Sequence, residues 1–447
     1  MTAAKVSVIS LGYVGTPLAA VLADAGFNVI GIQRMSHRSG WKIDWINRGK
    51  SPISGNEPWI GELIRVVSES GRLRATDDLG EIANSEIVVI TVQTPLNERK
   101  EPDFSILIEA CEQVGRNITA GTLVCLESTV PPGTTENIVK PILERESGLR
   151  VGDGFNLVFC YERVTPGYLI ENLKTLPRVV GGITTQCTER GAEFYEKITE
   201  ATVFKTDPCT AETSKLIENS HRDVNIAFAN EAALICKSLG VDFYDVRRFV
   251  NSLPMRPGSS NPYRNLLEPG AGVGGHCLPK DSYLLLYSMR RLNPESFPRL
   301  IILGREINES MPDVVRDMII DGLGELGRSI SDSKIGILGL SYKADSEDAR
   351  NSPTLCLINK LESSSVYVHD PYITDNSEVK THSLIDTVLG SDCLVVMTKH
   401  KEYEGLELKR IASLMRTRFI VDGRCLFDPI ECAKKGFVYR GLEYVTV

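Results

Sequence analysis

The chain has 447 residues, of which 42% are hydrophobic and 24% are charged, and its formal net charge is −8. This length predicts several domains, and an acidic balance without runs of lysine or arginine argues against a nucleic-acid partner. No apolar stretch approaches the roughly 18 residues of a membrane span. The first residues lack the apolar core and cleavage site of a signal peptide. We therefore expect a cytoplasmic protein with no membrane partner.

The 11 cysteines and six histidines are dispersed along the chain. No CxxC pair and no HxxxH or HExxH pattern occurs, so we expect neither a disulfide framework nor a metal site. Most of the cysteines are predicted to be small buried residues of a protein in a reducing compartment.

Residues 1–208 alternate apolar, strand-like runs with segments of helical length. A β-branched run over 5–12 ends in a glycine turn, a helical pattern closes at Gly26, and a second apolar run starts at Phe27. This order is a βαβ unit. Strands alternating with helices predict an α/β domain with a doubly wound parallel sheet. Further strand-like runs cover 86–92, 122–129 and 156–161.

A long helix is predicted over 209–240, which contains no proline and only one glycine, at its end. Its apolar residues recur at helical spacing over about 30 residues, more than is usual in a globular domain. Such a helix can join two domains and offer surface to a second subunit. We assign residues 209–325 to a central helical region. Within it, the stretch 252–275 is rich in proline, glycine and serine, and is expected to form a functional loop.

A second, smaller Rossmann-like domain is predicted over 326–447. A strand beginning at Lys334 ends in a glycine turn, as in the first domain. Two α/β domains joined by a helix predict a cleft where ligands bind. The later strand-like runs of this domain are 366–370, 393–398 and 418–423.

The stretch SLGYVGTPLA at 10–19 indicates a dinucleotide site. Gly12 and Gly15 follow a strand and open a helix, so the backbone can approach a pyrophosphate at the helix N-terminus. The third glycine of the GxGxxG pattern is absent, and a plain strand–helix turn is the alternative. The position expected to contact the ribose is Gln33, followed by Arg34. NAD is the expected cofactor; Arg34 would attract a 2′-phosphate, which leaves NADP open.

The stretch GAGVGGHCLPKD at 270–281 indicates a nucleophilic cysteine. Its glycines permit close backbone approach, and Lys280 and His276 offer positive charge beside Cys277. Asp281 would lie on the same side as Cys277 if a helix starts here. The alternative is a structural cysteine next to a turn.

Polar residues of the long helix and of several loops are further candidates. Lys215 and Asn219 share a helical face, with Glu212 and Arg222 about one turn outside them. The alternative for this face is solvation or an intrahelical ion pair. Loops after predicted strands would lie near a cofactor, although each is weak evidence alone. These loops are 93–97, 127–135 and 160–167, and a polar loop at 341–353 predicts a second phosphate site or a solvated loop.

Taken in order, these motifs resemble the nucleotide-sugar 6-dehydrogenases, the family of UDP-glucose, UDP-N-acetylmannosamine and GDP-mannose dehydrogenases. The resemblance covers nearly the whole chain. It implies two Rossmann-like domains joined by a long central helix through which a homodimer, or a larger assembly, forms. It rests on GYVG at 12–15, QTP at 93–95, ESTVPPGTTE at 127–136, AETSKLIENSHRDVNIAFANE at 211–231, GAGVGGHCLPKD at 270–281 and YKADSEDARNSP at 342–353.

The resemblance implies oxidation of a sugar C6 alcohol to a carboxylate with two NAD+ and no metal. Cys277 would hold the aldehyde as a thiohemiacetal and then a thioester. Lys215 and Asn219 would stabilise the oxyanion or help to deprotonate the alcohol. Asp281 and Thr129 would position a water molecule, with Glu162 as acid or base. The resemblance also places Gly12, Tyr13, Val14, Gly15, Thr94, Pro95, Thr129 and Arg350 around NAD, and Glu162, Arg163, Lys215, Asn219, Arg222, Gly274, His276 and Lys343 around the UDP-sugar.

Several departures bear on the substrate. Gln33 replaces the usual acid, and a second glutamate downstream of Glu162 is missing. ERVTPG, HRDVNIAFANE and His276 resemble the branch that acts on UDP-N-acetylhexosamines. We expect UDP-N-acetyl-D-mannosamine, then UDP-GlcNAc or UDP-GalNAc, then UDP-glucose, for surface polysaccharide or glycan synthesis.

Two alternatives belong to other classes. A single-oxidation dehydrogenase of 3-hydroxy-acid type would need neither Cys277 nor a second Rossmann-like domain. A non-catalytic nucleotide-sugar binder would not need Lys215, Asn219 and Cys277 together.

Overall fold

The structure is a computed structural model that describes residues 3–36, 39–53, 57, 59–253, 265–295, 298–361, 365–374 and 376–442. It divides into two compact units: Met1–Glu218 with Tyr283–Phe297, and Asn219–Ser282 with Pro298–Val447. Of the predicted loop over 252–275, residues 254–264 lie outside the described residues. Among the helices described, none combines the length and apolarity needed to cross a membrane.

An eight-stranded sheet with the order β3-β2-β1-β4-β5-β6-β7-β8 forms the centre of the first unit. The predicted doubly wound sheet is confirmed, with one departure: β6 and β7 pair antiparallel. The segment that connects β6 and β7 contains the seven-residue helix α6. The strands are β1 (Lys5–Ile9), β2 (Asn28–Ile32), β3 (Leu73–Thr76), β4 (Ile87–Ile90), β5 (Leu123–Leu126), β6 (Asn156–Cys160), β7 (Arg178–Gly182) and β8 (Val203–Thr206).

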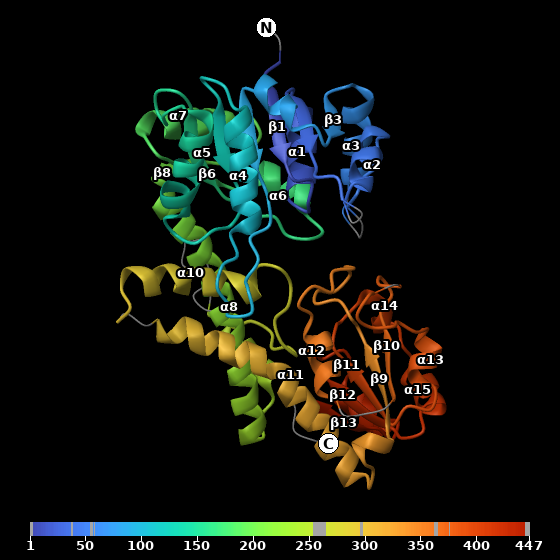
Figure 1. The fold of residues 1–447 in the computed structure, drawn as a ribbon. Coiled ribbons are helices and arrows are strands. Elements are labelled where there is room, and N and C mark those ends of the chain that lie inside the picture. Colours follow the sequence, from blue (N-terminus) through green and yellow to red (C-terminus); the bar gives the residue numbers. More distant parts are fainter. Residues whose placement is uncertain are drawn as a thin grey trace. The chain divides into compact units, whose positions relative to one another are not determined.

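Helices cover both faces of this sheet (Figure 1). Val6 and Val8 of β1 enter one core, and Ile9 enters the other, which is why the strands read as continuous apolar runs. The strand order reverses between β1 and β4, so ligands are expected at the carboxyl ends of these strands. The helices are α1 (Gly15–Asp24), α2 (Trp41–Asn47), α3 (Ile60–Glu69), η1 (Leu79–Asn84), α4 (Ser105–Asn117), η2 (Thr135–Val139), α5 (Lys140–Ser147), α6 (Leu169–Thr175) and α7 (Thr185–Tyr195).

The predicted long helix is confirmed as α8, a continuous helix of 32 residues from Pro208 to Leu239. It ends because Gly240 adopts a left-handed conformation with φ +69°, the usual helix stop. Asp242 then caps the next helix by accepting from the backbone N–H of Asp245. The boundary between the two units passes through α8 and again through α10. The helices that follow α8 are α9 (Phe243–Val250), α10 (Leu278–Leu292) and α11 (Arg299–Glu325).

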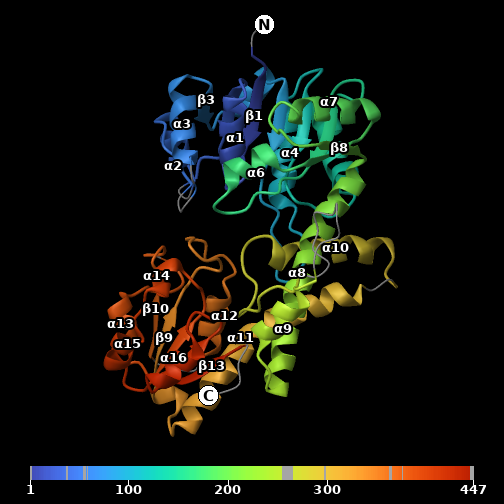
Figure 2. The ribbon, with the colours of Figure 1, turned by 180° about the vertical axis from the view of Figure 1, so that it is seen from behind.

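A five-stranded, wholly parallel sheet with the order β10-β9-β11-β12-β13 lies in the second unit. The second Rossmann-like fold is therefore confirmed, and Figure 2 shows this sheet in orange and red between its helices. The strands are β9 (Lys334–Leu338), β10 (Ser365–His369), β11 (Cys393–Val396), β12 (Phe419–Asp422) and β13 (Val438–Gly441). The helices are η3 (Ile330–Asp332), α12 (Pro353–Lys360), α13 (Leu384–Val388), α14 (Lys401–Glu404), α15 (Leu408–Leu414) and α16 (Pro429–Lys434).

Candidate active site

The turn between β1 and α1 has the backbone of a dinucleotide site. Ser10 stands where the fingerprint has its first glycine and adopts φ +80°. In this register Gly15 is the third glycine, so the expectation that the third glycine is absent was wrong. A side chain at Gly15 would overlap with the Ser10 carbonyl oxygen, so glycine is required there. A Cβ at Gly12 would meet only Ser10 Oγ, at 4.0 Å, so this side of the turn is open. No side chain caps the N-terminus of α1 at Val14, and the turn fits a pyrophosphate.

Gln33 and Arg34 follow β2, where the ribose-reading residue was predicted. Gln33 is 8% exposed. Its Oε1 accepts from the Leu11 N–H at 2.9 Å, and its Nε2 donates to Ser39 Oγ at 3.2 Å. The Arg34 guanidinium lies 3.0 Å from the carboxylate of Glu109. Gln33 therefore holds the backbone of the β1–α1 turn at Leu11. Glu109 opposes binding of a 2′-phosphate by Arg34, and this favours NAD over NADP.

Tyr13 leads to Glu57, a residue that was not predicted. The Tyr13 hydroxyl donates to Glu57 Oε1 at 2.5 Å, and the Gly167 N–H donates to the same oxygen at 2.6 Å. Glu57 thus ties the cofactor turn to the loop after β6. An isolated glutamate in a loop carries no local sequence signal, because its partners are 44 and 110 residues away.

Thr94 and Thr129 meet at the carboxyl edge of the sheet. The Thr94 hydroxyl donates to the Thr129 carbonyl oxygen at 2.6 Å, which joins the loops after β4 and β5. Pro95 follows, and its carbonyl oxygen accepts from the Asp103 N–H at 2.8 Å. The residues predicted near the cofactor from β1, β4 and β5 are thus on the same edge, next to the strand-order reversal.

Lys215 and Glu162 form a buried pair. Lys215 is 4% exposed and Glu162 7%, which excludes a solvated face for this lysine. Lys215 Nζ donates to the Glu162 carbonyl oxygen at 2.7 Å and lies 3.5 Å from its Oε1. The Nζ also lies 5.5 Å from the centre of the Tyr161 ring. An ammonium and a carboxylate held together in a dry site can exchange a proton.

Glu212, one turn before Lys215, is buried as well. Its carboxylate accepts from the Gly133 N–H at 2.6 Å and from the N–H and hydroxyl of Thr135 at 2.8 and 2.6 Å. Burial raises the pKa of Glu212 to about 7. The carboxylate therefore anchors the loop after β5 to α8, and the solvated reading of Glu212 is wrong because the loop covers it.

The Arg163 guanidinium is bound by groups of the first unit. Its guanidinium lies 2.7 Å from Glu218, and it donates to the Pro177 carbonyl oxygen at 2.7 Å and to the Tyr161 hydroxyl at 2.9 Å. These contacts hold the loop that also carries Glu162.

In the second unit, Cys277 is exposed directly before α10. Its carbonyl oxygen accepts from the N–H groups of Lys280 and Asp281, both at 2.9 Å. A thiolate at a helix N-terminus is stabilised by the unpaired N–H groups and the helix dipole.

Most other cysteines are buried, as predicted; burial raises the pKa of Cys111, for example, to about 12. The buried cysteines are Cys111, Cys125, Cys160, Cys187, Cys236, Cys393 and Cys432.

Asn219 and Asp281 are brought together 62 residues apart in sequence. Asn219 Nδ2 donates to Asp281 Oδ2 at 2.6 Å, and Lys280 Nζ lies 3.2 Å from Asp281 Oδ1. Asp281 is 1% exposed, so its charge is confined to these partners. Because α8 is continuous, Lys215 lies one helical turn before Asn219.

His276 does not supply the positive charge that was predicted. Burial, together with the charge of Lys280, lowers the pKa of His276 to about 4. The imidazole is therefore neutral near pH 7. Lys280 remains the cation of this loop, paired with Asp281.

The glycines before Cys277 make room for the chain itself. A Cβ at Gly274 would lie 2.5 Å from Tyr342 Cβ, and one at Gly275 would lie 2.8 Å from the Tyr342 ring. A Cβ at Gly272 would lie 3.1 Å from Pro353. The sequence predicted that these glycines permit close approach to the backbone. In the structure, the group that approaches these three glycines is the loop over 341–353, which packs against them.

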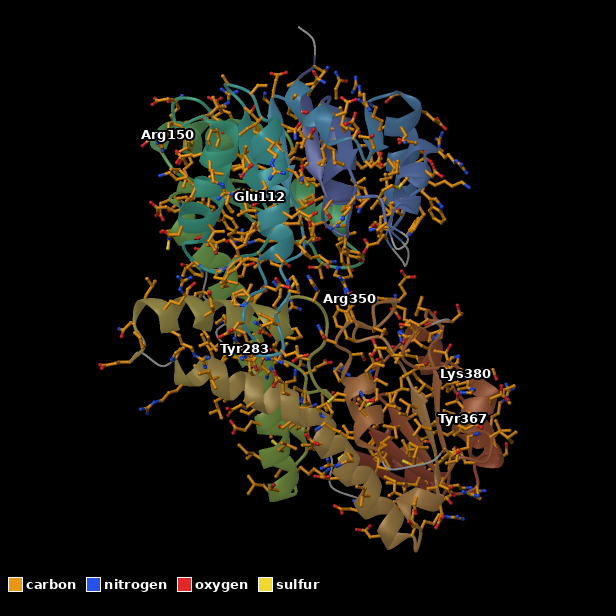
Figure 3. The ribbon with its side chains drawn as sticks, viewed as in Figure 1. Glu112, Arg150, Tyr283, Arg350, Tyr367 and Lys380 are labelled. Atoms are coloured by element: carbon orange, nitrogen blue, oxygen red, sulfur yellow. The ribbon has the colours of Figure 1, made fainter. Side chains whose placement is uncertain are left out.

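This same loop carries Lys343 and Arg350. Arg350, labelled in Figure 3, lies in the loop after β9, and its guanidinium contacts both carboxylate oxygens of Asp348 at 2.8 and 2.6 Å. Lys343 is half-buried, and Arg222 is exposed on α8. Near these groups burial raises the pKa of Tyr342 to about 12, so its hydroxyl stays protonated.

Three consecutive segments match the UDP-glucose/GDP-mannose dehydrogenase family: its NAD binding domain at 4–199, its central domain at 209–310 and its UDP binding domain at 336–429. The chain belongs to this family. This nucleotide-sugar dehydrogenase uses NAD, in agreement with the geometry of the β1–α1 turn.

Relatives of the dehydrogenase span its full length. A UDP-N-acetyl-D-mannosamine dehydrogenase from Pyrococcus horikoshii is 36% identical over 98% of this chain and 99% of the relative. A solved structure of UDP-D-ManNAc dehydrogenase from Pyrococcus horikoshii covers the same shares, with a TM-score of 0.89. The structure of an NDP-N-acetyl-D-galactosaminuronic acid dehydrogenase from Methanosarcina mazei Go1 is 38% identical. It covers 99% of this chain and 96% of that chain, with a TM-score of 0.87.

Proposed function

We propose that this dehydrogenase oxidises C6 of UDP-N-acetyl-D-mannosamine to the carboxylate, for surface polysaccharide or glycan synthesis. The observation that carries the proposal is the exposed Cys277 at the N-terminus of α10, four residues before the buried Asp281 that accepts from Asn219. An alcohol oxidation alone would not need this thiol. NAD+, when bound, accepts one hydride in each of two oxidations.

In the first oxidation the Lys215–Glu162 pair receives the proton of the C6 hydroxyl. The 2.7 Å bond from Lys215 Nζ fixes the ammonium on the Glu162 loop, so the pair can hold a positive charge next to the developing alkoxide. Asn219 supplies an amide as a second partner for the oxygen. The carbon loses a hydride and the hydroxyl loses a proton, which leaves the aldehyde.

In the second oxidation the Cys277 thiolate adds to the aldehyde carbon, and the oxygen takes back the proton held by the Lys215–Glu162 pair, giving a thiohemiacetal. The thiohemiacetal then loses its C6 hydrogen as the second hydride, and its hydroxyl proton passes through the same pair to solvent, giving a thioester. Asp281 and Thr129 position water and Glu162 accepts its proton. Water adds to the acyl carbon, the carbon–sulfur bond breaks, and the carboxylate and the free thiol are released.

Domain roles follow the same proposal: residues 1–208 bind NAD, 209–325 form the catalytic and dimerisation region, and 326–447 bind the UDP moiety. Around NAD we place Gly12, Tyr13, Val14, Gly15, Gln33, Arg34, Thr94, Pro95, Thr129 and Arg350. Around the UDP-sugar we place Glu162, Arg163, Lys215, Asn219, Arg222, Gly274, His276 and Lys343.

The substrate assignment is supported by the relative from Pyrococcus horikoshii. The Methanosarcina mazei structure, at 38% identity, supports UDP-N-acetylgalactosamine as a second candidate. A panel of UDP-sugars, with NADH counted per limiting sugar and the product identified by mass spectrometry and NMR, separates them. We expect two NADH per UDP-N-acetyl-D-mannosamine; one NADH per sugar, or turnover of UDP-glucose alone, refutes the proposal.

We further propose a cytoplasmic homodimer formed through α8. Exposed apolar residues recur on this helix: Phe228 is 61% exposed and Leu239 72%, a costly arrangement for a surface without a partner. Phe228→Glu would place two charges in the interface. Light scattering after size exclusion should show dimer for the parent and monomer for the variant; an unchanged dimer contradicts this interface.

A further inference from the structure

The loop that carries Cys277 is hydrogen-bonded at Gly275 to the loop after β9. The Gly275 N–H donates to the Arg350 carbonyl oxygen at 2.9 Å, and Asn351 Nδ2 donates to the Gly275 carbonyl oxygen at 2.9 Å. Both polar groups of Gly275 are therefore held by two successive residues of the loop after β9. Cys277 lies two residues further on, and a displacement at Gly275 would move the thiol.

The backbone conformations of Asn351 and Gly275 suit this pair of hydrogen bonds, which we call the Gly275 clamp. Asn351 adopts φ +50° and Gly275 φ +90°, and asparagine tolerates the left-handed region better than most residues. Asn351 directly precedes Ser352, which caps α12 by accepting from the Thr354 N–H. The turn leaves the Asn351 side chain directed at Gly275, although the residue itself is exposed.

We propose that Asn351 is a positioning residue for the Cys277 thiol, a role that rests on the proposed function. The first oxidation requires no thiol, whereas the second requires sulfur within bonding reach of the aldehyde carbon. A displacement of about 1 Å can cost on the order of 100-fold in rate. Loss of the Asn351 bond should therefore impair the second oxidation more than the first.

Two variants remove the bond in different ways. Asn351→Gly retains a residue that accepts positive φ but has no side-chain donor. Asn351→Asp keeps the shape and presents an acceptor to the Gly275 carbonyl oxygen. A matched control is Asp345→Gly, which also has positive φ (+58°) in the same loop and whose side chain bonds to the Lys401 N–H, not to the thiol loop.

The test measures NADH per limiting UDP-sugar, aldehyde trapped by hydroxylamine, and the iodoacetamide alkylation rate of Cys277 followed by peptide mass spectrometry. The parent and Asp345→Gly should give two NADH. Asn351→Gly and Asn351→Asp should fall toward one NADH and release aldehyde, with Cys277 alkylation changed at least about threefold. UDP affinity should stay within about twofold, because the clamp acts on the thiol.

Two NADH per sugar and the parent alkylation rate in both Asn351 variants would overturn the role. So would a proportional loss of both oxidations with a lowered Tm, since that pattern reports a structural residue. If the parent itself fails to give two NADH, the proposed function fails. The alkylation rates then still decide whether Asn351 positions the thiol.

Discussion

Gly12 of the β1–α1 turn and Gly275 of the loop before Cys277 require glycine for opposite reasons. At the β1–α1 turn, a Cβ on Gly12 would have no protein atom nearer than 4.0 Å. In the loop over 270–277, which carries the Cys277 thiol, a Cβ on Gly275 would lie 2.8 Å from the Tyr342 ring. The first glycine keeps space open for a ligand, and the second lets the chain close on itself. A glycine-rich string therefore does not identify a ligand contact until the neighbours of each glycine are known.

The largest effect is expected at Gly275. Alanine there would require φ +90° and would push the Tyr342 ring away, a strain of about 1–3 kcal/mol. Gly275→Ala should lower Tm and reduce kcat by at least about 100-fold, as measured by thermal unfolding and NADH production. A variant with parental Tm and kcat would show that the packing of Tyr342 on Gly275 is not needed.

Gly12→Ala should affect binding and not the fold. Its Cβ would enter the open side of the turn, so the KM for NAD+ should rise about tenfold or more because the pyrophosphate can no longer approach the backbone. The Tm without cofactor should change by less than about 2 °C, since no protein atom is displaced. Calorimetric titration with NADH and thermal unfolding check both; an unchanged NADH affinity would contradict the assignment of this turn.

The two units also anchor their loops through different groups: a carboxylate in the first unit and an amide in the second. The carboxylate predicts a pH-dependent stability for the first unit. Glu212, whose pKa burial raises to about 7, holds Gly133 and Thr135, whereas the amide of Asn351 does not titrate. A raised carboxyl pKa means that the folded state binds more protons than the unfolded one between about pH 4.5 and 7. Stability from this group is therefore present at low pH and lost as pH rises through about 7.

Glu212→Gln should remove this contribution to the pH dependence. From about pH 5 to 8 the Tm of the parent should decline relative to the Tm of the variant. If the whole pKa shift is expressed, the free energy of unfolding of the parent falls by an amount on the order of 3 kcal/mol relative to that of the variant. Parallel Tm curves for the two proteins would show that Glu212 does not titrate in this range.

Much of the architecture could be predicted from local pattern. The absence of proline and internal glycine over 209–239 fixed α8 closely, and apolar runs located β1, β4 and β11. β8 was not predicted, because the strand Val203–Thr206 is short and has exposed residues at its centre. The strand β7 (Arg178–Gly182) was not predicted either, and no local pattern encodes its antiparallel direction.

The sequence could single out candidate site residues where they follow strands or share a helical face, but it could not give their contact partners. Lys215 reaches Glu162 across 53 residues and Asn219 reaches Asp281 across 62. Glu57 accepts from the Tyr13 hydroxyl and the Gly167 N–H, and Asn351 donates to the Gly275 carbonyl oxygen, in each case over more than 40 residues of sequence. Such contacts arise from folding, and no spacing rule encodes them. The neutral state of His276 likewise follows from burial that only the structure defines.

The central claim is that Cys277 is the covalent nucleophile of a four-electron oxidation. The most direct test counts NADH per limiting UDP-N-acetyl-D-mannosamine for the parent and for Cys277→Ala, with binding of the UDP-sugar measured in parallel. We predict two NADH for the parent, at most one and no uronate for Cys277→Ala, and little change in binding. Two NADH and full uronate formation by Cys277→Ala would contradict the thioester mechanism.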